Sequence, residues 1–215
     1  MKKPRVLMAD DHSLILAGLR KLVESECEVV GTVEDGRALV EAAQKLRPDL
    51  ILLDISMPLL NGLEAARQLR TLVPGSKLIF LTMHASPTYA AEAFQAGASG
   101  YLLKRSAASE LSLAIGSVLQ GQHYLTPSLT KDVLGAILKP STGERCKPKS
   151  MALTARQREV LQLVAEGRNT KAIATLLNVS VKTVEFHKSR IMQQLGVHTT
   201  ADLTKYAITH GITGL

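Results

Sequence analysis

In the first half of the chain, short apolar runs alternate with segments whose apolar residues recur at helical spacing. A wholly apolar run of about five residues is typical of a strand buried on both faces of a parallel sheet. The run at 50–54, which ends at Asp54, is of this kind, and less uniform apolar runs predict strands at 5–9, 29–33, 77–82 and 100–104. The helical spacing predicts helices at 13–23, 37–46, 63–72, 88–96 and 110–119. This alternation predicts a doubly wound, five-stranded parallel α/β domain with the flavodoxin-like strand order 2-1-3-4-5.

Beyond residue 150 the pattern changes to short helical segments without strands. Thr154 with Gln157 forms a capping-box pattern at the start of a helix that Gly167 ends. Thr170 is a candidate cap for the next helix, and Ser180 for a longer helix that runs to residue 194. A fourth helix is predicted at 201–208. A short helix, a tight turn and a longer helix are typical of a small all-α helix-turn-helix domain, although other small helical bundles share the pattern.

These patterns divide the chain into three parts. Residues 1–121 form the sheet domain, 122–150 a linker that can hold a short helix near 129–138, and 151–215 the helical domain. The linker is polar, basic and interrupted by proline and glycine. No apolar run is long enough to span a bilayer, and the start of the chain does not resemble a signal peptide. The two cysteines, Cys27 and Cys146, are too few and too far apart for a disulfide framework.

The net positive charge of the chain comes entirely from residues 122–215. Residues 1–121 carry 13 basic and 13 acidic side chains, whereas residues 122–215 carry 13 basic and 6 acidic ones, a net charge of +7. This excess favours a polyanionic partner for the helical domain. Aromatic residues make up only 3% of the chain, so duplex DNA is a better candidate than a single strand held by base stacking.

Polar residues follow four of the predicted strands of the sheet domain, where each strand ends. Asp10 and Asp11 follow the first strand, Asp54 ends the third, Thr82 the fourth and Lys104 the fifth. The carboxyl ends of parallel strands meet at one edge of the sheet, so these side chains should converge there. Three carboxylates on one edge favour a bound Mg²⁺. With the hydroxyl and the ammonium group beside them, they predict a cradle for a phosphoryl group carried on an aspartate.

Each of these residues also has an ordinary structural explanation. Asp10 and Asp11 can stabilise the positive start of the helix at 13–23, and Thr82 can satisfy the end of a strand. Lys104 can be a solvated surface lysine. Their placement at consistent strand ends favours the shared site over these separate explanations.

Residues 5–120 resemble a response-regulator receiver domain. The resemblance rests on Met8-Ala9-Asp10-Asp11-His12, Leu53-Asp54-Ile55-Ser56-Met57-Pro58 with Asn61-Gly62, Phe80-Leu81-Thr82, and Ala96-Gly97-Ala98-Ser99-Gly100-Tyr101-Leu102-Leu103-Lys104. It implies that Asp54 accepts a phosphoryl group from a sensor histidine kinase. It also implies that Mg²⁺ is held by Asp10, Asp11, Asp54 and the backbone carbonyl of Ser56. Thr82 and Lys104 would bind the phosphoryl oxygens, and Tyr101 would change rotamer as Thr82 moves. Ser56 and His84 stand at positions that vary in the family and tune the lifetime of the phosphoryl group.

The longer helix of the second domain has one apolar stripe, formed by Val184, Ile191 and Leu195. The remaining faces offer candidate DNA contacts at Lys182, Thr183, Glu185, Phe186, Lys188, Ser189 and Arg190. Phe186 suits thymine methyl groups and Glu185 a cytosine amino group, whereas Lys188 and Arg190 suit phosphates. His187 lies beside the apolar stripe, so packing explains it better than base contact does.

Residues 153–212 resemble the LuxR-type DNA-binding domain. The matching residues include Leu153-Thr154, Arg158-Glu159-Val160-Leu161, Ile173-Ala174, Val179-Ser180, Lys182-Thr183-Val184-Glu185-Phe186-His187 and Leu195-Gly196-Val197. Ala172 stands where the family usually has glutamate, and Gln194 where it usually has lysine. The order of the two domains is that of NarL/FixJ-type regulators. The resemblance implies that the last helix pairs two DNA-bound subunits.

The sequence therefore predicts a cytoplasmic, bacterial-type transcription factor that is switched by phosphorylation of Asp54. Its expected partners are a sensor histidine kinase, promoter DNA and a second copy of the chain, with no membrane and no separate enzymatic substrate. One alternative is a regulator of the same architecture that ignores phosphorylation. The other is an enzyme of the sheet domain. The first strand is followed neither by the DxDxT motif of aspartyl-nucleophile phosphatases nor by a glycine-rich phosphate loop.

Overall fold

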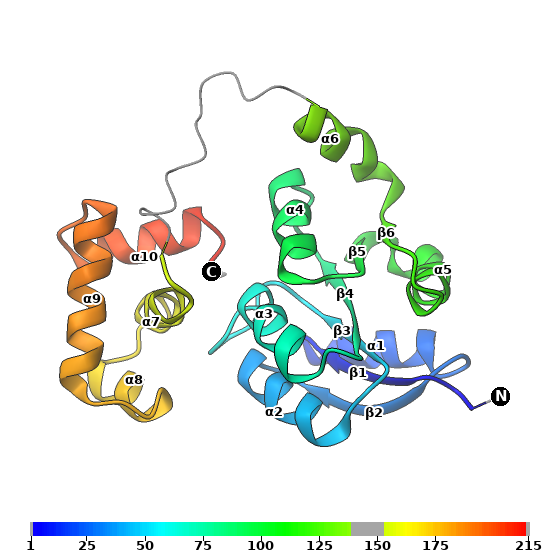
Figure 1. Cartoon of the computed structure of the whole chain (residues 1–215), viewed down its shortest axis with the longest axis horizontal. Helices are drawn as coiled ribbons and strands as arrows, with labels where there is room; N and C mark the ends of the chain where they lie inside the picture. The colour runs from blue at the N-terminus through cyan, green and yellow to red at the C-terminus, as the bar shows by residue number, and fades with distance from the viewer. Residues whose placement is uncertain (1, 139–152, 214–215) are drawn as a thin grey trace. The chain divides into compact units, whose positions relative to one another are not determined.

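The structure is a computed structural model that describes residues 2–138 and 153–213. The chain divides into two compact units, Met1–Pro140 and Ser141–Leu215 (Figure 1). The first contains a sheet with helices on both faces, and the second is helical. The alternation of strand and helix patterns in the first part of the sequence, and the purely helical patterns beyond residue 150, predict these two fold types.

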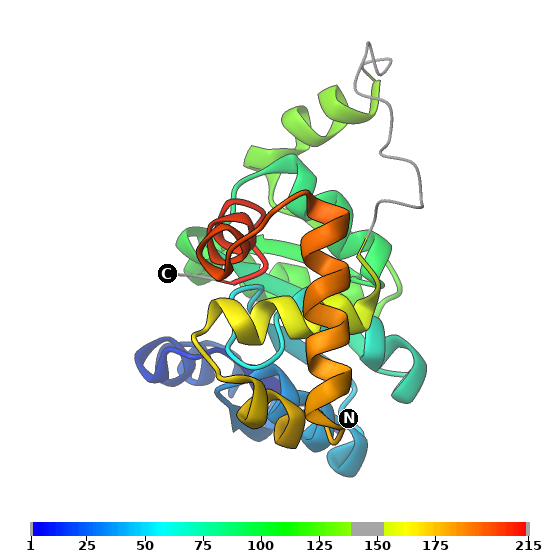
Figure 2. The same ribbon diagram turned by 90° about the vertical axis from the view of Figure 1, so that its left-hand side faces the viewer.

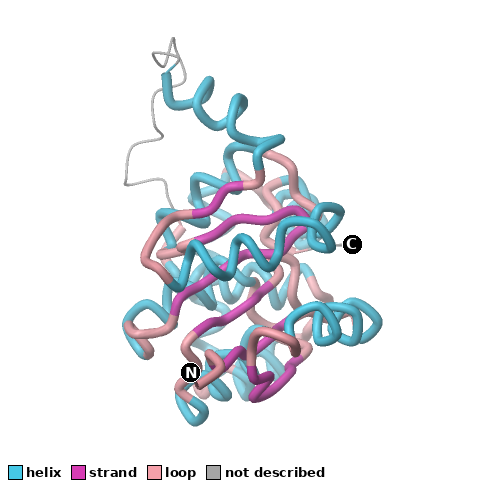
Figure 3. The backbone as a smooth tube through the Cα atoms, turned by 90° about the vertical axis from the view of Figure 1, so that its right-hand side faces the viewer, coloured by secondary structure: helices cyan, strands magenta, loops and turns pink. Residues whose placement is uncertain are grey.

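The first unit contains a parallel sheet of six strands in the order β2-β1-β3-β4-β5-β6 (Figure 3). The strands are β1 (Arg5–Ala9), β2 (Glu28–Val33), β3 (Leu50–Leu53), β4 (Lys77–Thr82), β5 (Gly100–Leu103) and β6 (Tyr124–Leu125). The flavodoxin-like order of the first five strands is confirmed. The prediction of five strands omits β6, because a strand of two residues is too short to show a period.

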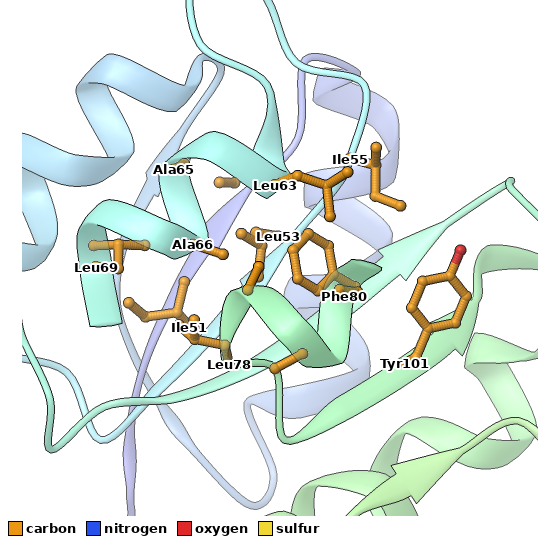
Figure 4. Packing of buried hydrophobic residues seen from close by; sticks show 14 of the residues in the cluster. Ile51, Leu53, Ile55, Leu63, Ala65, Ala66, Leu69, Leu78, Phe80 and Tyr101 are labelled. Atoms are coloured by element: carbon orange, nitrogen blue, oxygen red, sulfur yellow. The ribbon is translucent and has the colours of Figure 1, made fainter. Parts of the chain in front are cut away.

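Two layers of helices cover the sheet. The first-unit helices are α1 (Ser13–Val23), α2 (Gly36–Leu46), α3 (Gly62–Leu72), α4 (Pro87–Ala96), α5 (Ala107–Leu119) and α6 (Pro127–Leu138), with a short 3₁₀ turn η1 (Lys104–Ser106). Alternate residues of one strand enter opposite cores, since Leu7 packs with α2, α3 and α4 whereas Met8 packs with α1 and α5. Figure 4 shows Leu53, Phe80 and Leu63 meeting in the first of these cores.

The segment after α5, which the pattern assigns to a linker, contains both β6 and α6. β6 pairs with the outer edge of β5, and α6 contacts α4. Leu129 and Val133 of α6 are buried in the core that also holds Tyr101. Residues 122–138 therefore extend the sheet unit, and the rest of the predicted linker, 139–150, lies outside the described residues.

The second unit consists of α7 (Ala155–Ala165), α8 (Thr170–Leu176), α9 (Val181–Leu195) and α10 (Thr200–Thr209). α7 contacts each of the other three helices, and α9 is the longest of them (Figure 2). The capping box of Thr154 with Gln157 and the cap at Ser180 are confirmed. The predicted cap at Thr170 is wrong by one residue, because Asn169 accepts the hydrogen bond from the Ala172 amide.

Two minor expectations from the sequence can also be compared with the structure. Within the described ranges, no helix combines the length and the apolar character that a bilayer crossing would require. Cys27 is a buried free thiol, and burial raises its pKa. Cys146 lies outside the described residues.

Candidate functional site

The polar strand ends of the first unit meet at one edge of the sheet, as the order 2-1-3-4-5 requires. β1 and β3 are neighbours, and the Asp54 amide donates to the Ala9 carbonyl at 3.0 Å. Asp10 and Asp54 therefore leave adjacent strands side by side. Gly62 closes the loop that follows β3, because a Cβ at this position would collide with the Asp54 carbonyl oxygen. The loop around Asp54 is thus fixed from both ends.

Lys104 bridges the two buried carboxylates. Its Nζ lies 2.7 Å from Asp10 Oδ2 and 2.7 Å from Asp54 Oδ2. The three side chains are 7%, 2% and 5% exposed, respectively. Burial lowers the pKa of Lys104, but hydrogen bonds and charges from Asp10 and Asp54 outweigh it, so the pKa is raised. The ammonium group is therefore charged where the carboxylates need a counter-charge.

The second Asp54 oxygen is also held. The Ile55 amide donates to Asp54 Oδ1 at 2.6 Å, while Lys104 contacts Oδ2. Each carboxylate oxygen thus has one donor, and the side chain is oriented before any ligand arrives. This arrangement places a nucleophilic oxygen beside a fixed positive charge.

Asp11 and His12 lie at the open side of this pocket. Asp11 is partly exposed, and His12 Nδ1 lies 2.9 Å from Asp11 Oδ1 and 3.2 Å from Asp10 Oδ1. The donor atoms of Asp10, Asp11 and His12 lie within 4.8 Å of one another. Carboxylate oxygens are the donors that Mg²⁺ takes in proteins, so Asp10 and Asp11 fit this ion, whereas an imidazole suits softer metals.

His84 links three residues that the sequence treats separately. Its amide donates to Thr82 Oγ1 at 3.3 Å, its carbonyl accepts from the Tyr101 hydroxyl at 2.7 Å, and its Nε2 lies 2.9 Å from Ser56 Oγ. The His84 ring stacks on Tyr89 of α4 with centroids 4.5 Å apart. The family resemblance identifies Ser56 and His84 as variable positions near the site. No spacing in the sequence indicates that their side chains touch.

Tyr101 of β5 is fully buried in the core that also holds Phe80 of β4 and Ala90 of α4 (Figure 4). Burial, followed by the Asp54 charge, strongly raises the pKa of its hydroxyl, which remains a hydrogen-bond donor. The hydroxyl is anchored to the loop that follows Thr82 at the end of β4. Movement of that loop therefore requires the Tyr101 hydrogen bond to break or to move with it.

In the second unit, α9 presents a mixed surface opposite its buried stripe. Val184 and Ile191 are buried as predicted, and Leu195 is half-buried. Lys182, Glu185, Phe186, Ser189 and Arg190 are exposed, and Thr183, His187 and Lys188 are half-buried. The candidate DNA contacts therefore occupy the open faces of the helix.

The structure adds three contacts on and beside α9 to the picture from the sequence. The Arg190 guanidinium lies over the Phe186 ring, 5.5 Å from its centroid. Lys188 Nζ donates to Thr200 Oγ1 at 2.9 Å, which ties α9 to the start of α10. Gln194, at the position where the family usually has lysine, accepts from Gln157 Nε2 at 2.7 Å and joins α9 to α7.

The fold and the pocket define a class of protein: a receiver-type α/β domain with a buried acidic pocket, followed by a helix-turn-helix unit. Two family models match the chain, "Response regulator receiver domain" over residues 6–116 and "Bacterial regulatory proteins, luxR family" over residues 151–207. The transcriptional regulatory protein MctR of Rhizobium johnstonii is 36% identical over 212 residues, which cover 98% of this chain and 95% of MctR. The response regulator UvrY of Escherichia coli is 34% identical over 209 residues, 96% of this chain and 94% of UvrY.

Solved structures agree over the same length. The RcsB response regulator of Salmonella typhimurium aligns with a TM-score of 0.65 at 30% identity and covers 100% of both chains. A complex of RcsB with DNA aligns with a TM-score of 0.59 at 28% identity, over 95% of this chain and 98% of that one. This chain belongs to the NarL/FixJ-type response regulators, which join a receiver domain to a LuxR-type DNA-binding domain.

Proposed function

We propose that Asp54 accepts a phosphoryl group from the phosphohistidine of a sensor histidine kinase and that this transfer switches DNA binding by the second unit. The observation that carries the proposal is the geometry of Asp54, whose two oxygens are held by Lys104 and by the Ile55 amide. An Asp54 oxygen forms the new bond to phosphorus while the phosphorus–nitrogen bond to the kinase imidazole breaks. The imidazole leaves as a neutral ring, because its other nitrogen takes a proton from water.

Mg²⁺ is the cofactor that the pocket fits best. Asp10, Asp11 and Asp54 would hold the ion together with the backbone carbonyl of Ser56. When bound, the ion neutralises the charge that the phosphoryl oxygens add to the carboxylates. With the ion bound beside Asp10, Lys104 would be available to bind a phosphoryl oxygen. We expect Asp11→Asn to weaken Mg²⁺ binding in a metal titration; unchanged affinity would leave Asp11 as a helix-start residue only.

Thr82, Lys104 and Tyr101 carry the switch in this proposal. Thr82 turns its hydroxyl toward the phosphoryl group, and the His84 segment bonded to it moves as well. Because the Tyr101 hydroxyl is bonded to the His84 carbonyl, its rotamer follows. A ligand shifts such an equilibrium only by stabilising one state more than the other, and the phosphoryl group does so through Thr82 and Lys104.

The proposed target of the second unit is promoter DNA, bound by two copies of the chain. The open faces of α9 supply Lys182, Thr183, Glu185, Phe186, Lys188, Ser189 and Arg190. RcsB is described in complex with DNA and as dimers on DNA, and the same mode is proposed here by similarity. Function at a promoter places the protein in the cytoplasm, and no enzymatic substrate other than its own acyl phosphate is proposed.

The proposal is tested by treating the protein with Mg²⁺ and a small phosphodonor and measuring its intact mass. We expect a gain of one phosphoryl group that Asp54→Asn abolishes. Asp132→Asn, at an exposed position on α6, is the matched control and should gain the group at the wild-type rate. The assignment would be contradicted if both variants failed to gain the phosphoryl group, or if both gained it. Steady release of phosphate from many donor molecules would favour the enzyme alternative.

The direction of the switch is a separate part of the proposal. The family resemblance favours a receiver that restrains the DNA-binding unit until phosphorylation and then dimerises. A fragment of residues 150–215 should then bind duplex DNA without phosphodonor, at least as well per subunit as the unphosphorylated full chain. If the fragment and the unphosphorylated chain both fail while the phosphorylated chain binds, dimerisation alone is the switch. Equal binding by the unphosphorylated and phosphorylated chains would favour the phosphorylation-independent regulator.

A further inference from the structure

The exposed aromatic ring on α9 is not explained by packing within the helical unit. Phe186 is 57% exposed, although Val184 and Ile191 of the same helix are buried in the core. The ring meets His187 in an edge contact with centroids 5.8 Å apart. The Arg190 guanidinium lies over the same ring. A large apolar ring in this position is held in place and left open to solvent.

Arg190 is arranged in a way that leaves its donors available. Its guanidinium carbon lies 5.5 Å from the Phe186 centroid, and among the described residues Arg190 forms no ion pair. A contact with an aromatic ring uses none of the guanidinium N–H groups as hydrogen-bond donors, so they stay available to donate in parallel. The contact also restricts a long side chain to few rotamers, which reduces the entropy lost on binding.

These two side chains match neighbouring features of the major groove. Arginine recognises guanine by donating to both O6 and N7, and an aromatic or apolar side chain recognises the methyl group of thymine. Successive base pairs are separated by about 3.4 Å along the duplex. A ring and a guanidinium 5.5 Å apart can therefore reach two adjacent base pairs but not two distant ones.

We propose that Phe186 and Arg190 act as one reading unit for a T·A pair next to a G·C pair within each half-site. In this unit the Phe186 ring contacts the thymine methyl group, and Arg190 reads the guanine rather than holding a phosphate. The inference rests on the proposed function, since it specifies the DNA sequence that α9 recognises. It changes the role that the sequence pattern gives to Arg190, and it leaves Lys188 as a phosphate contact.

The experiment is selection of duplexes from a random library by the full chain after treatment with Mg²⁺ and phosphodonor. The wild-type protein should enrich half-sites that contain thymine next to guanine. Affinities are then measured on the selected duplex and on a scrambled duplex at one salt concentration. Arg190→Lys keeps the positive charge but cannot form the paired contact, so it should lower affinity for the selected duplex by about tenfold and for the scrambled one by less than twofold.

Three further variants distinguish a loss of base recognition from a loss of helix stability and from a general effect of charge. Phe186→Leu should also reduce the preference, and the double variant should lose less than the product of the two single losses, because the two residues act together. Arg168→Lys, at an exposed position in the loop before α8, is the matched control and should leave the preference unchanged. Thermal unfolding of each variant shows whether the helix itself has been destabilised.

Several outcomes would overturn the inference. These are a selected site without adjacent T·A and G·C pairs, equal loss of affinity on both duplexes for Arg190→Lys, or independent effects of the two residues. In each case the wild-type protein still selects DNA, so the proposed function stands. If the phosphorylated wild-type protein enriches no duplex, the proposed function fails together with the inference.

Discussion

The pocket around Asp54 and the helix α9 use charge in opposite ways. In the pocket, Asp10, Asp54 and Lys104 are buried and paired at 2.7 Å. On α9, Lys182 and Arg190 are exposed, and neither forms an ion pair among the described residues. One region supplies its own counter-charges, whereas the other leaves them to a partner.

The difference agrees with what each region is proposed to bind. A covalent acceptor must hold its oxygen in one geometry, and buried hydrogen-bonded charges hold geometry well. A buried charge is costly unless it is paired, so the pocket must be complete within the chain. DNA brings its own phosphates, and basic side chains that wait in water gain affinity when counterions are released. Removing a charge from the pocket should therefore destabilise the fold. Removing a charge from α9 should weaken only the complex with DNA.

The largest expected effect is that of removing the central cation of the pocket. Lys104→Met leaves two buried carboxylates facing each other, and the free energy of unfolding at neutral pH should fall by roughly 3 kcal/mol. Lys45→Met is the control, since Lys45 pairs with Glu41 at 2.7 Å on an exposed helix face. Its effect should stay below about 0.5 kcal/mol. Urea unfolding of the two variants and the wild-type protein would measure both changes in the free energy of unfolding.

Added Mg²⁺ sharpens the same comparison. The ion should raise the melting temperature of Lys104→Met by more than that of the wild-type protein, because it replaces the missing counter-charge of Asp10 and Asp54. Equal stability of Lys104→Met and the wild-type protein without Mg²⁺ would mean that the carboxylates do not need the lysine, and the comparison would fail.

The next effect is a dependence on alkaline pH. The pKa of Lys104 is raised above its ordinary value of 10.5 in the folded chain, so its contribution to stability is complete below pH 10.5. That contribution is lost as pH rises through the raised value. The gap in unfolding free energy between wild type and Lys104→Met should stay constant from pH 7 to pH 10 and narrow above pH 10.5. A gap that already narrows near pH 8 would contradict the raised pKa.

A smaller effect is expected on DNA binding. Lys188→Met should weaken binding to all duplexes to a similar degree and lower the slope of log affinity against log salt by about one unit. Lys131→Met, exposed on α6 of the sheet unit, is the control and should leave the slope unchanged. If Lys188→Met alters sequence preference instead, the bond from Lys188 Nζ to Thr200 positions the reading face and the phosphate assignment is wrong.

The smallest expected effect is on the stability of the helical unit. Phe186→Ala should lower the free energy of unfolding by no more than about 1 kcal/mol, the scale of an exposed cation–π contact. Ile191→Ala, on the buried stripe of the same helix, should lower it by about 2 to 4 kcal/mol. Thermal unfolding of the two variants measures this ratio. A large loss for Phe186→Ala would make the ring part of the core.

The sequence by itself determined the main features of both regions. Apolar runs ending in Asp10, Asp54 and Lys104 were sufficient to predict the sheet and its edge, because strand ends in a parallel sheet converge whatever the loops do. Caps such as Thr154 and Ser180 are local, since the bonded groups are three residues apart.

Only the tertiary structure decided which distant side chains touch. The bonds from His84 to Ser56 and Tyr101 join residues from three different segments, and no period or spacing encodes them. β6 forms because the edge of β5 offers unpaired backbone groups. A strand of two residues has no periodic pattern of its own, so the sequence alone does not predict it. Helical periodicity placed Phe186 on an open face of α9. The position of the Arg190 guanidinium over that ring depends on the Arg190 rotamer, which the surrounding structure determines.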